Sequence, residues 1–144
     1  MNIQFSRSRF FSILAISGII ISLTSCTSKY AFQTSPTVPA ARGTVKVKKD
    51  GNSNYLIKVY ISNLAEVKRL QQGKEAYVVW MVGDGDVTKN IGQINSSSSM
   101  ISSKLKASFQ TVSSTKPHRV FITAEDNGQA STPGSTLILS TDKF

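Results

Sequence analysis

The strongest constraint on the fold is an alternation of apolar and polar residues that recurs in short segments from Gly43 onward. A period of two places successive side chains on opposite faces of a β-strand. Turn-forming pairs such as Asp50-Gly51 separate the segments. The predicted strands are residues 44–48, 55–61, 75–82, 88–94, 105–109, 119–124 and 136–140. The most apolar of them, 75–82, has the β-branched and aromatic content of a central strand.

Seven short strands within residues 43–144 are typical of one all-β domain, an antiparallel β-sandwich of immunoglobulin-like type. The chain has a single cysteine, Cys26, so no disulfide within the chain links the two sheets. Packing of the sheets must therefore stabilise the domain. Residues 63–73 predict a helical turn or a crossover loop, and the serine-rich residues 95–103 predict a loop.

The first part of the chain has the features of a secretory signal. Arg7 and Arg9 precede an apolar run of 14 residues, 10–23, which is shorter than the roughly 20 residues that span a bilayer as a helix. The motif Leu23-Thr24-Ser25-Cys26 that follows resembles the bacterial lipobox. The resemblance implies cleavage before Cys26 and diacylation of its thiol, so residues 1–25 are interpreted as a lipoprotein signal peptide.

The expected mature chain, residues 26–144, keeps 15 of the 17 basic residues and all eight acidic ones. This positive charge favours anionic partners such as lipid headgroups or acidic glycans. No basic run is interleaved with aromatic residues, which argues against nucleic acid as a partner. Residues 26–42 contain Pro36 and Pro39 without strand or helix periodicity. They are predicted to form a flexible tether between the membrane and the domain.

Two motifs of the predicted domain resemble the extracytoplasmic C-terminal domain of anti-sigma-K factors. They are Leu70-x-x-Gly73-x-x-x-Tyr77-x-x-Trp80 and Val120-x-Ile122-x-x-Glu125-Asp126-x-Gly128-x-x-Ser131-x-Pro133-x-Ser135. The resemblance covers residues 43–140 and implies a sandwich fold and an envelope location. Such factors hold a sigma factor through a cytoplasmic helical domain and a transmembrane helix. We expect neither here, so the resemblance is taken to extend to fold and location alone.

Four acidic residues are the candidates for ligand binding. Asp84 and Asp86 flank a glycine in one predicted turn, and Glu125 and Asp126 begin a long loop, residues 125–135. Carboxylate oxygens suit Ca²⁺, and loops on a rigid sandwich often carry recognition. The spacing lacks the full calcium-loop pattern, and Asp-Gly pairs commonly form turns. The turn interpretation is therefore preferred, and no metal is assigned.

Catalytic chemistry has little support in the sequence. One histidine and one cysteine exclude clustered zinc sites and iron–sulfur centres, which need several such ligands. His118 is the only candidate base for a serine triad, and no Gly-x-Ser-x-Gly motif marks a nucleophile. We therefore expect no enzyme activity and no cofactor, and a structural or exposed role for His118.

Aromatic and basic residues allow further binding interpretations. Trp80 with Tyr77 and Tyr60 would suit a glycan or peptide platform, but a core role for Trp80 is preferred because its strand is so apolar. Lysines are expected on the outer face of the first hairpin, at Lys46, Lys48, Lys49 and Lys58. They would meet anionic headgroups or a partner, or protect an edge strand from aggregation, which is the default interpretation.

The sequence thus predicts a non-catalytic, lipid-anchored β-sandwich protein of the cell envelope that acts through protein or envelope contacts. Its predicted partners are membrane lipid, through acylated Cys26, and an envelope protein. The alternative is a module that binds a small ligand, a glycan or calcium through the 84–86 turn and the 125–135 loop. Thr27 follows Cys26 where an inner-membrane retention signal has aspartate, so resemblance to known lipoprotein sorting favours the outer membrane.

Overall fold

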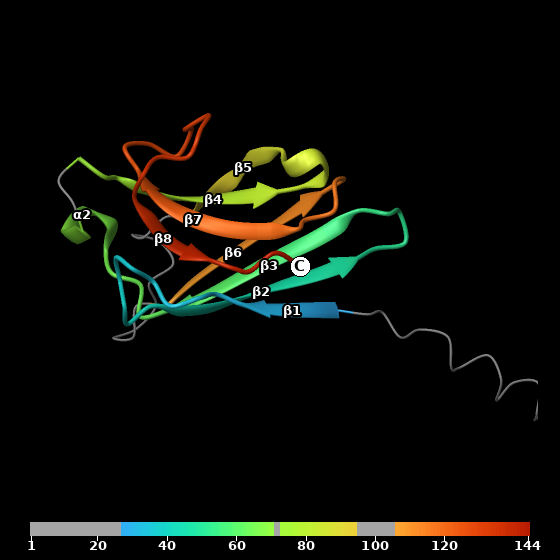
Figure 1. Ribbon diagram of the computed structural model, residues 1–144, viewed down its shortest axis with the longest axis horizontal. Helices are drawn as coiled ribbons and strands as arrows, with labels where there is room; N and C mark the ends of the chain where they lie inside the picture. Colours follow the sequence, from blue (N-terminus) through green and yellow to red (C-terminus); the bar gives the residue numbers. More distant parts are fainter. Residues whose placement is uncertain (1–26, 71–72, 95–105) are drawn as a thin grey trace, which may run out of the picture.

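Eight strands form two antiparallel four-stranded sheets that stack face to face (Figure 1). The computed structural model describes residues 27–70, 73–94 and 106–144. The prediction of an all-β antiparallel sandwich is confirmed, with one strand more than predicted. Cys26 and the signal segment lie outside the described residues, as does the predicted loop 95–103. Within the described ranges, no helix is long and apolar enough to cross a bilayer.

The first sheet has the order β1-β2-β3-β6 and the second the order β5-β4-β7-β8. The strands of the first sheet are β1 (Thr27–Ala31), β2 (Arg42–Lys49), β3 (Tyr55–Ser62) and β6 (Ala107–Ser113). Those of the second sheet are β4 (Ala76–Val82), β5 (Thr88–Ile94), β7 (Arg119–Glu125) and β8 (Leu137–Ser140). The other elements are a short helix, α2 (Val67–Leu70), and a 3-10 turn, η1 (Asp84–Asp86).

Strand β4 is the centre of the second sheet, as its composition predicted, and all of its residues are buried. Tyr77, Val79 and Met81 point into the core between the sheets. They meet the inward-facing residues of the first sheet, among them Val45, Ile57 and Val59. The Tyr77 hydroxyl donates a hydrogen bond of 2.7 Å to the Ala65 carbonyl, and burial raises the Tyr77 pKa well above its usual range. The core therefore also fixes the segment that precedes α2.

The predicted flexible tether over residues 26–42 is wrong for the residues that the structure describes. Strand β1 pairs with β2 along its whole length, from Thr27 opposite Lys48 to Ala31 opposite Thr44. Phe32 then forms a bridge with Thr141, which follows β8 of the other sheet. The segment thus belongs to the sandwich and joins its two layers at one edge.

The reason for this error lies in the spacing of the buried residues. Phe32, Ser35, Val38 and Ala41 are buried, one at every third position. A period of three matches neither the strand nor the helix pattern, so the segment resembles a linker in sequence. The Val38 amide donates to the Ser35 hydroxyl at 2.8 Å, which shapes the turn around Pro36.

The hairpin between β2 and β3 forms around Asp50, as predicted. One carboxylate oxygen of Asp50 accepts hydrogen bonds from the main-chain amides of Asn52 and Asn54, each at 2.8 Å. These bonds favour the ionised carboxylate. The Asn54 amide, followed by the Asn52 amide and the Asn54 side chain, holds the pKa of Asp50 below its usual value.

Asp50→Asn is expected to remove a pH-dependent contribution to stability while keeping a side-chain acceptor for the two amides. Because the folded pKa is lowered, this contribution is present above the unfolded pKa of about 3.9. It is lost as the pH falls through the folded pKa. Urea unfolding between neutral pH and about pH 2 measures the free energy of unfolding of both proteins. Wild type should have the higher value at neutral pH, and the two values should converge in acid. A constant difference across this range would contradict the assignment.

Candidate functional site

The four acidic candidates lie in two separate places. Asp84 and Asp86 belong to η1, directly after β4, whereas Glu125 ends β7 and Asp126 follows it. Strands β4 and β7 are antiparallel, with Ala76 opposite Glu125 at one end and Val82 opposite Arg119 at the other. The two pairs therefore lie at opposite ends of the sheet and cannot share one cation. In the described part of the chain, no three His, Cys, Asp or Glu side chains come together as a metal site.

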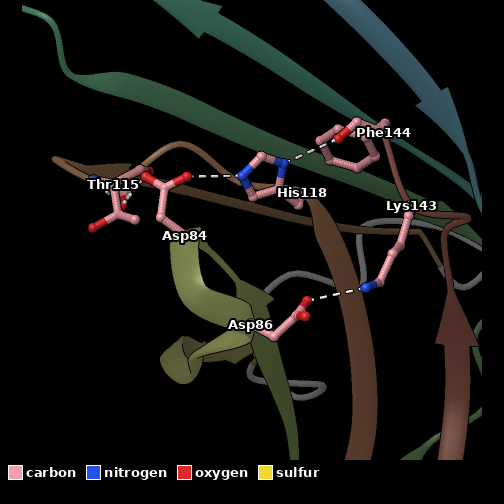
Figure 2. Close-up of polar contacts among 7 residues, drawn as sticks. Asp84, Asp86, Thr115, His118, Lys143 and Phe144 are labelled. Carbon is pink, nitrogen blue, oxygen red and sulfur yellow. Dashed lines mark hydrogen bonds and ion pairs between the residues drawn. The ribbon is translucent and has the colours of Figure 1, made fainter.

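At the η1 end, both aspartates are engaged by basic side chains (Figure 2). Asp84 Oδ1 lies 2.8 Å from His118 Nε2, and Asp86 Oδ1 lies 3.0 Å from Lys143 Nζ. The backbone brings these partners together, because the His118 amide donates to the Val82 carbonyl and the Phe144 amide to the His118 carbonyl, each at 2.8 Å. Ion pairs and hydrogen bonds thus connect the η1 turn with His118 and with the C-terminal residues at this end of the sandwich.

Both ring nitrogens of His118 face acceptor atoms at this end of the sandwich. Its Nε2 faces the Asp84 carboxylate, and its Nδ1 lies 3.3 Å from the main-chain oxygen of Phe144. The pair of Asp84 and His118 was not predicted. Strands β4 and β7 bring the two residues together, because Val82 lies opposite Arg119, and the sequence of either strand alone carries no signal for that pairing.

At the opposite end, Glu125 completes a buried polar chain. The Trp80 indole N–H donates to the Thr123 hydroxyl at 2.7 Å, and that hydroxyl donates to Glu125 Oε1. The Gly134 amide also donates to Glu125 Oε1, at 2.8 Å. Asp126, which is exposed, pairs instead with Lys74 at 2.9 Å. Glu125 thus holds the 125–135 loop against the sheet and is unavailable to a ligand.

The loop after Glu125 covers the outer face of the second sheet. The Asn90 side-chain amide donates to the main-chain oxygens of Gly128 and Ala130, at 3.1 and 2.9 Å. Asn90 lies opposite Trp80 in the register of β4 and β5, so the loop passes over the face that carries Trp80. Trp80 is fully buried, so it is not an exposed aromatic platform, but it lies on the outer face of β4 against Phe121 and beneath the loop, and not in the predicted core between the sheets.

No known protein family, curated protein or solved structure matches this chain. The resemblances to the lipobox and to the anti-sigma-K domain stay predictions from sequence motifs. The functional argument therefore rests on the surfaces of the sandwich itself.

The outer face of the first sheet carries a row of lysines, which we call the lysine face. Lys29 of β1 lies opposite Lys46 of β2, and Lys46 lies opposite Lys58 of β3. Lys48 adds a fourth ammonium two residues along β2. The four strands of this sheet contain no aspartate or glutamate. The predicted outward direction is confirmed at Lys46, Lys48 and Lys58. Each is next to buried residues that point to the inner face, and alternate residues of a strand point to opposite faces. These buried neighbours are Val45, Val47, Ile57 and Val59.

Lys49 is the exception among the predicted lysines. It has the inward parity of Val45 and Val47, but it lies at the end of β2, where its ammonium is 5.9 Å from the ring centre of Tyr55. Lys29 was not predicted on this face, because its strand was interpreted as tether.

Apolar and aromatic side chains lie among the lysines. Tyr60 is 44% exposed, and the Lys46 ammonium lies 5.5 Å from its ring centre. Val112 of β6 is 60% exposed. A shallow groove on this face is lined by Thr27, Lys46, Lys48, Leu56, Lys58 and Tyr60. The face thus combines positive charge with exposed apolar area and has no acidic side chain.

Lys58→Gln is expected to raise the free energy of unfolding by about 0.2–1 kcal/mol at low ionic strength, because like charges opposite each other on paired strands repel. Lys46 is the less suitable target, since its contact with Tyr60 would be lost as well. Lys48→Gln is the matched control, because Lys48 lies opposite Thr27 and Leu56, which carry no charge.

Urea unfolding of the two variants measures this repulsion. The increase in the free energy of unfolding in Lys58→Gln should become smaller at high salt, which screens exposed charges. Lys48→Gln should have nearly the same free energy of unfolding as wild type. Equal changes in the two variants would contradict repulsion along the row.

Proposed function

We propose that this protein is a non-catalytic, lipid-anchored β-sandwich of the bacterial cell envelope that acts through contacts of its surface. The observation that carries the proposal is the lysine face, a positively charged sheet surface whose strands contain no acidic residue. The acidic candidates, by contrast, are engaged within the domain, Asp84 by His118, Asp86 by Lys143 and Glu125 by Thr123. The basic charge of the lysine face has no acidic side chain on its own strands to pair with, so it is free to meet a partner.

The anchor in this proposal is Cys26, at the end of the motif that resembles a lipobox. Two or three acyl chains hold a protein on a membrane nearly permanently, since each buried methylene contributes about 0.8 kcal/mol. The sorting argument from Thr27 favours the outer membrane, and an envelope component, protein or lipid, is the proposed partner. The sandwich fold itself supports no particular activity.

Fractionation of the native envelope tests the anchor. Wild type is expected in the membrane fraction after an alkaline wash, which releases peripheral proteins. Cys26→Ala alone is an ambiguous control, because a chain that is not cleaved keeps its apolar segment 10–23. The control should therefore carry an ordinary cleavable secretion signal in place of residues 1–25, together with Cys26→Ala.

This control is expected among the soluble envelope proteins. If it sediments with the membranes as wild type does after the wash, the lipid anchor is wrong. Affinity capture of the anchored wild type, followed by mass spectrometry, then tests for a protein partner. A partner retained by wild type and by a variant with all four lysines of the lysine face changed to glutamine would contradict the role of that face.

A further inference from the structure

The lysine face begins directly beside the proposed anchor. Strand β1 starts at Thr27, the residue that follows Cys26, and Thr27 itself lines the groove with Lys46, Lys48 and Lys58. In Figure 1, β1, β2 and β3 form the lower layer of the sandwich, and the second sheet covers their inner side. An acyl chain on Cys26 is thus one residue from the lysine face, with no linker between them.

The charges on this face have no counterpart in the domain. Lys29, Lys46 and Lys58 stand opposite one another on three neighbouring strands, which lie about 4.8 Å apart. The acidic residues of the chain all lie outside the strands of this sheet, at Asp50, Glu66, Glu75, Asp84, Asp86, Glu125, Asp126 and Asp142. Only an external anion can neutralise the row.

The other side chains of the face suit the boundary between water and lipid. Tyr60 is half-exposed and has an apolar ring with a polar end, a combination enriched at membrane interfaces. Leu56 lines the groove, and Val112 is exposed at the β6 side. Lysine side chains bury their aliphatic stems while their ammonium groups stay among polar groups.

We propose that the lysine face docks on the anionic phospholipid headgroups of the membrane that holds Cys26, so that the domain lies flat on the bilayer. This inference rests on the proposed function, because the anchor brings the face to the membrane. Phospholipid is favoured over an acidic glycan or protein since the row of ammonium groups spans three neighbouring strands beside the attachment point. Each lysine near an anionic surface contributes a roughly fivefold increase in binding.

Lysine acetylation of the lipidated protein tests the docking. The protein is extracted from its native membrane and reconstituted into vesicles of phosphatidylcholine alone, or of equal parts phosphatidylcholine and phosphatidylglycerol. Mass spectrometry then gives the acetylation rate at each lysine. The controls are exposed lysines in other parts of the domain, Lys68, Lys89 and Lys116.

On anionic vesicles, acetylation of Lys29, Lys46, Lys48 and Lys58 is expected to slow about fivefold relative to neutral vesicles. High salt should reverse the effect, and the control lysines should react equally on both vesicles. Equal rates at the lysine face on both vesicles, with the protein still bound, would overturn the docking and leave the anchor intact. Release of the protein from both vesicles would instead overturn the lipid anchor.

A polysaccharide arm separates lipid from glycan. Polygalacturonate is added to the protein on neutral vesicles, and protection there without protection on anionic vesicles would overturn the proposal in favour of an acidic glycan. A variant pair then tests the charge itself. Lys29→Gln/Lys46→Gln/Lys58→Gln should lose the protection of the remaining Lys48, whereas Lys68→Gln/Lys89→Gln/Lys116→Gln should keep it. Equal protection of Lys48 in the two variants would overturn the proposal.

Discussion

Phe32→Ala is expected to lower the free energy of unfolding by about 3–5 kcal/mol, the usual cost of removing a buried phenylalanine side chain. Phe32 is 8% exposed, and its amide donates to the Gly43 carbonyl at 3.0 Å. Its ring lies where a Cβ on Gly43 would be 2.9 Å from Cδ2, so β2 packs closely against it. The residue joins β1 to the rest of the sandwich, and its loss opens that edge.

Equilibrium urea unfolding of the secreted, unacylated form measures the change. The matched control is Tyr60→Ala, because Tyr60 is a ring of similar size that is 44% exposed. This control should cost far less than Phe32→Ala. An unchanged midpoint in Phe32→Ala would contradict the packing of this segment and mean that the chain after β1 is a flexible tether after all.

Trp80→Ala is expected to cost about 3–5 kcal/mol for the lost side chain, with a further loss from the polar chain that it leaves incomplete. Trp80 is fully buried and stacks on Phe121 at 6.3 Å between ring centres. Its indole N–H is the donor to Thr123, which in turn contacts Glu125. Removing the indole ring also removes part of the surface beneath the 125–135 loop, whose main-chain oxygens bind the Asn90 side chain.

Trp80→Phe separates the two contributions. It keeps most of the buried ring and loses the N–H, so about 1–3 kcal/mol is expected. Circular dichroism during urea unfolding gives both values, since the variants contain no other tryptophan to report by fluorescence. A cost below about 1 kcal/mol for Trp80→Ala would indicate a surface platform and contradict the burial of Trp80 beneath the loop.

The sequence predicts a strand of this fold well where its buried residues alternate or are continuous, and poorly where they recur with another spacing. Residues 55–61, 75–82 and 119–124 alternate or are uniformly apolar, and all three became strands near the predicted bounds. Strand β1 was missed because it has few apolar residues, and because burial after it recurs at every third residue. Its pairing with β2 is a tertiary contact that no local pattern encodes.

The candidate site shows a second limit of sequence patterns. Asp84 was correctly predicted to follow one strand and Glu125 to lie at the end of another. These two strands are antiparallel neighbours, so their C-terminal residues lie at opposite ends of the sheet. Only the pairing of β4 with β7 separates the two residues, and that pairing was not predicted. The lysine face was found for the opposite reason, because parity along β2 and β3 fixes the direction of Lys46, Lys48 and Lys58. Lys29 was not predicted, because it lies in β1, the strand that the sequence patterns did not indicate.

The most direct test of the account is the mass of the N-terminal tryptic peptide of the protein isolated from its native membrane. The account predicts a peptide of residues 26–29 that begins at Cys26 and carries a diacylglycerol thioether on that residue. A fatty acyl chain on the new amine is the expected further addition. A peptide that begins upstream of Cys26, or one with a free Cys26 thiol, would contradict the anchor and with it the placement of the lysine face on the membrane.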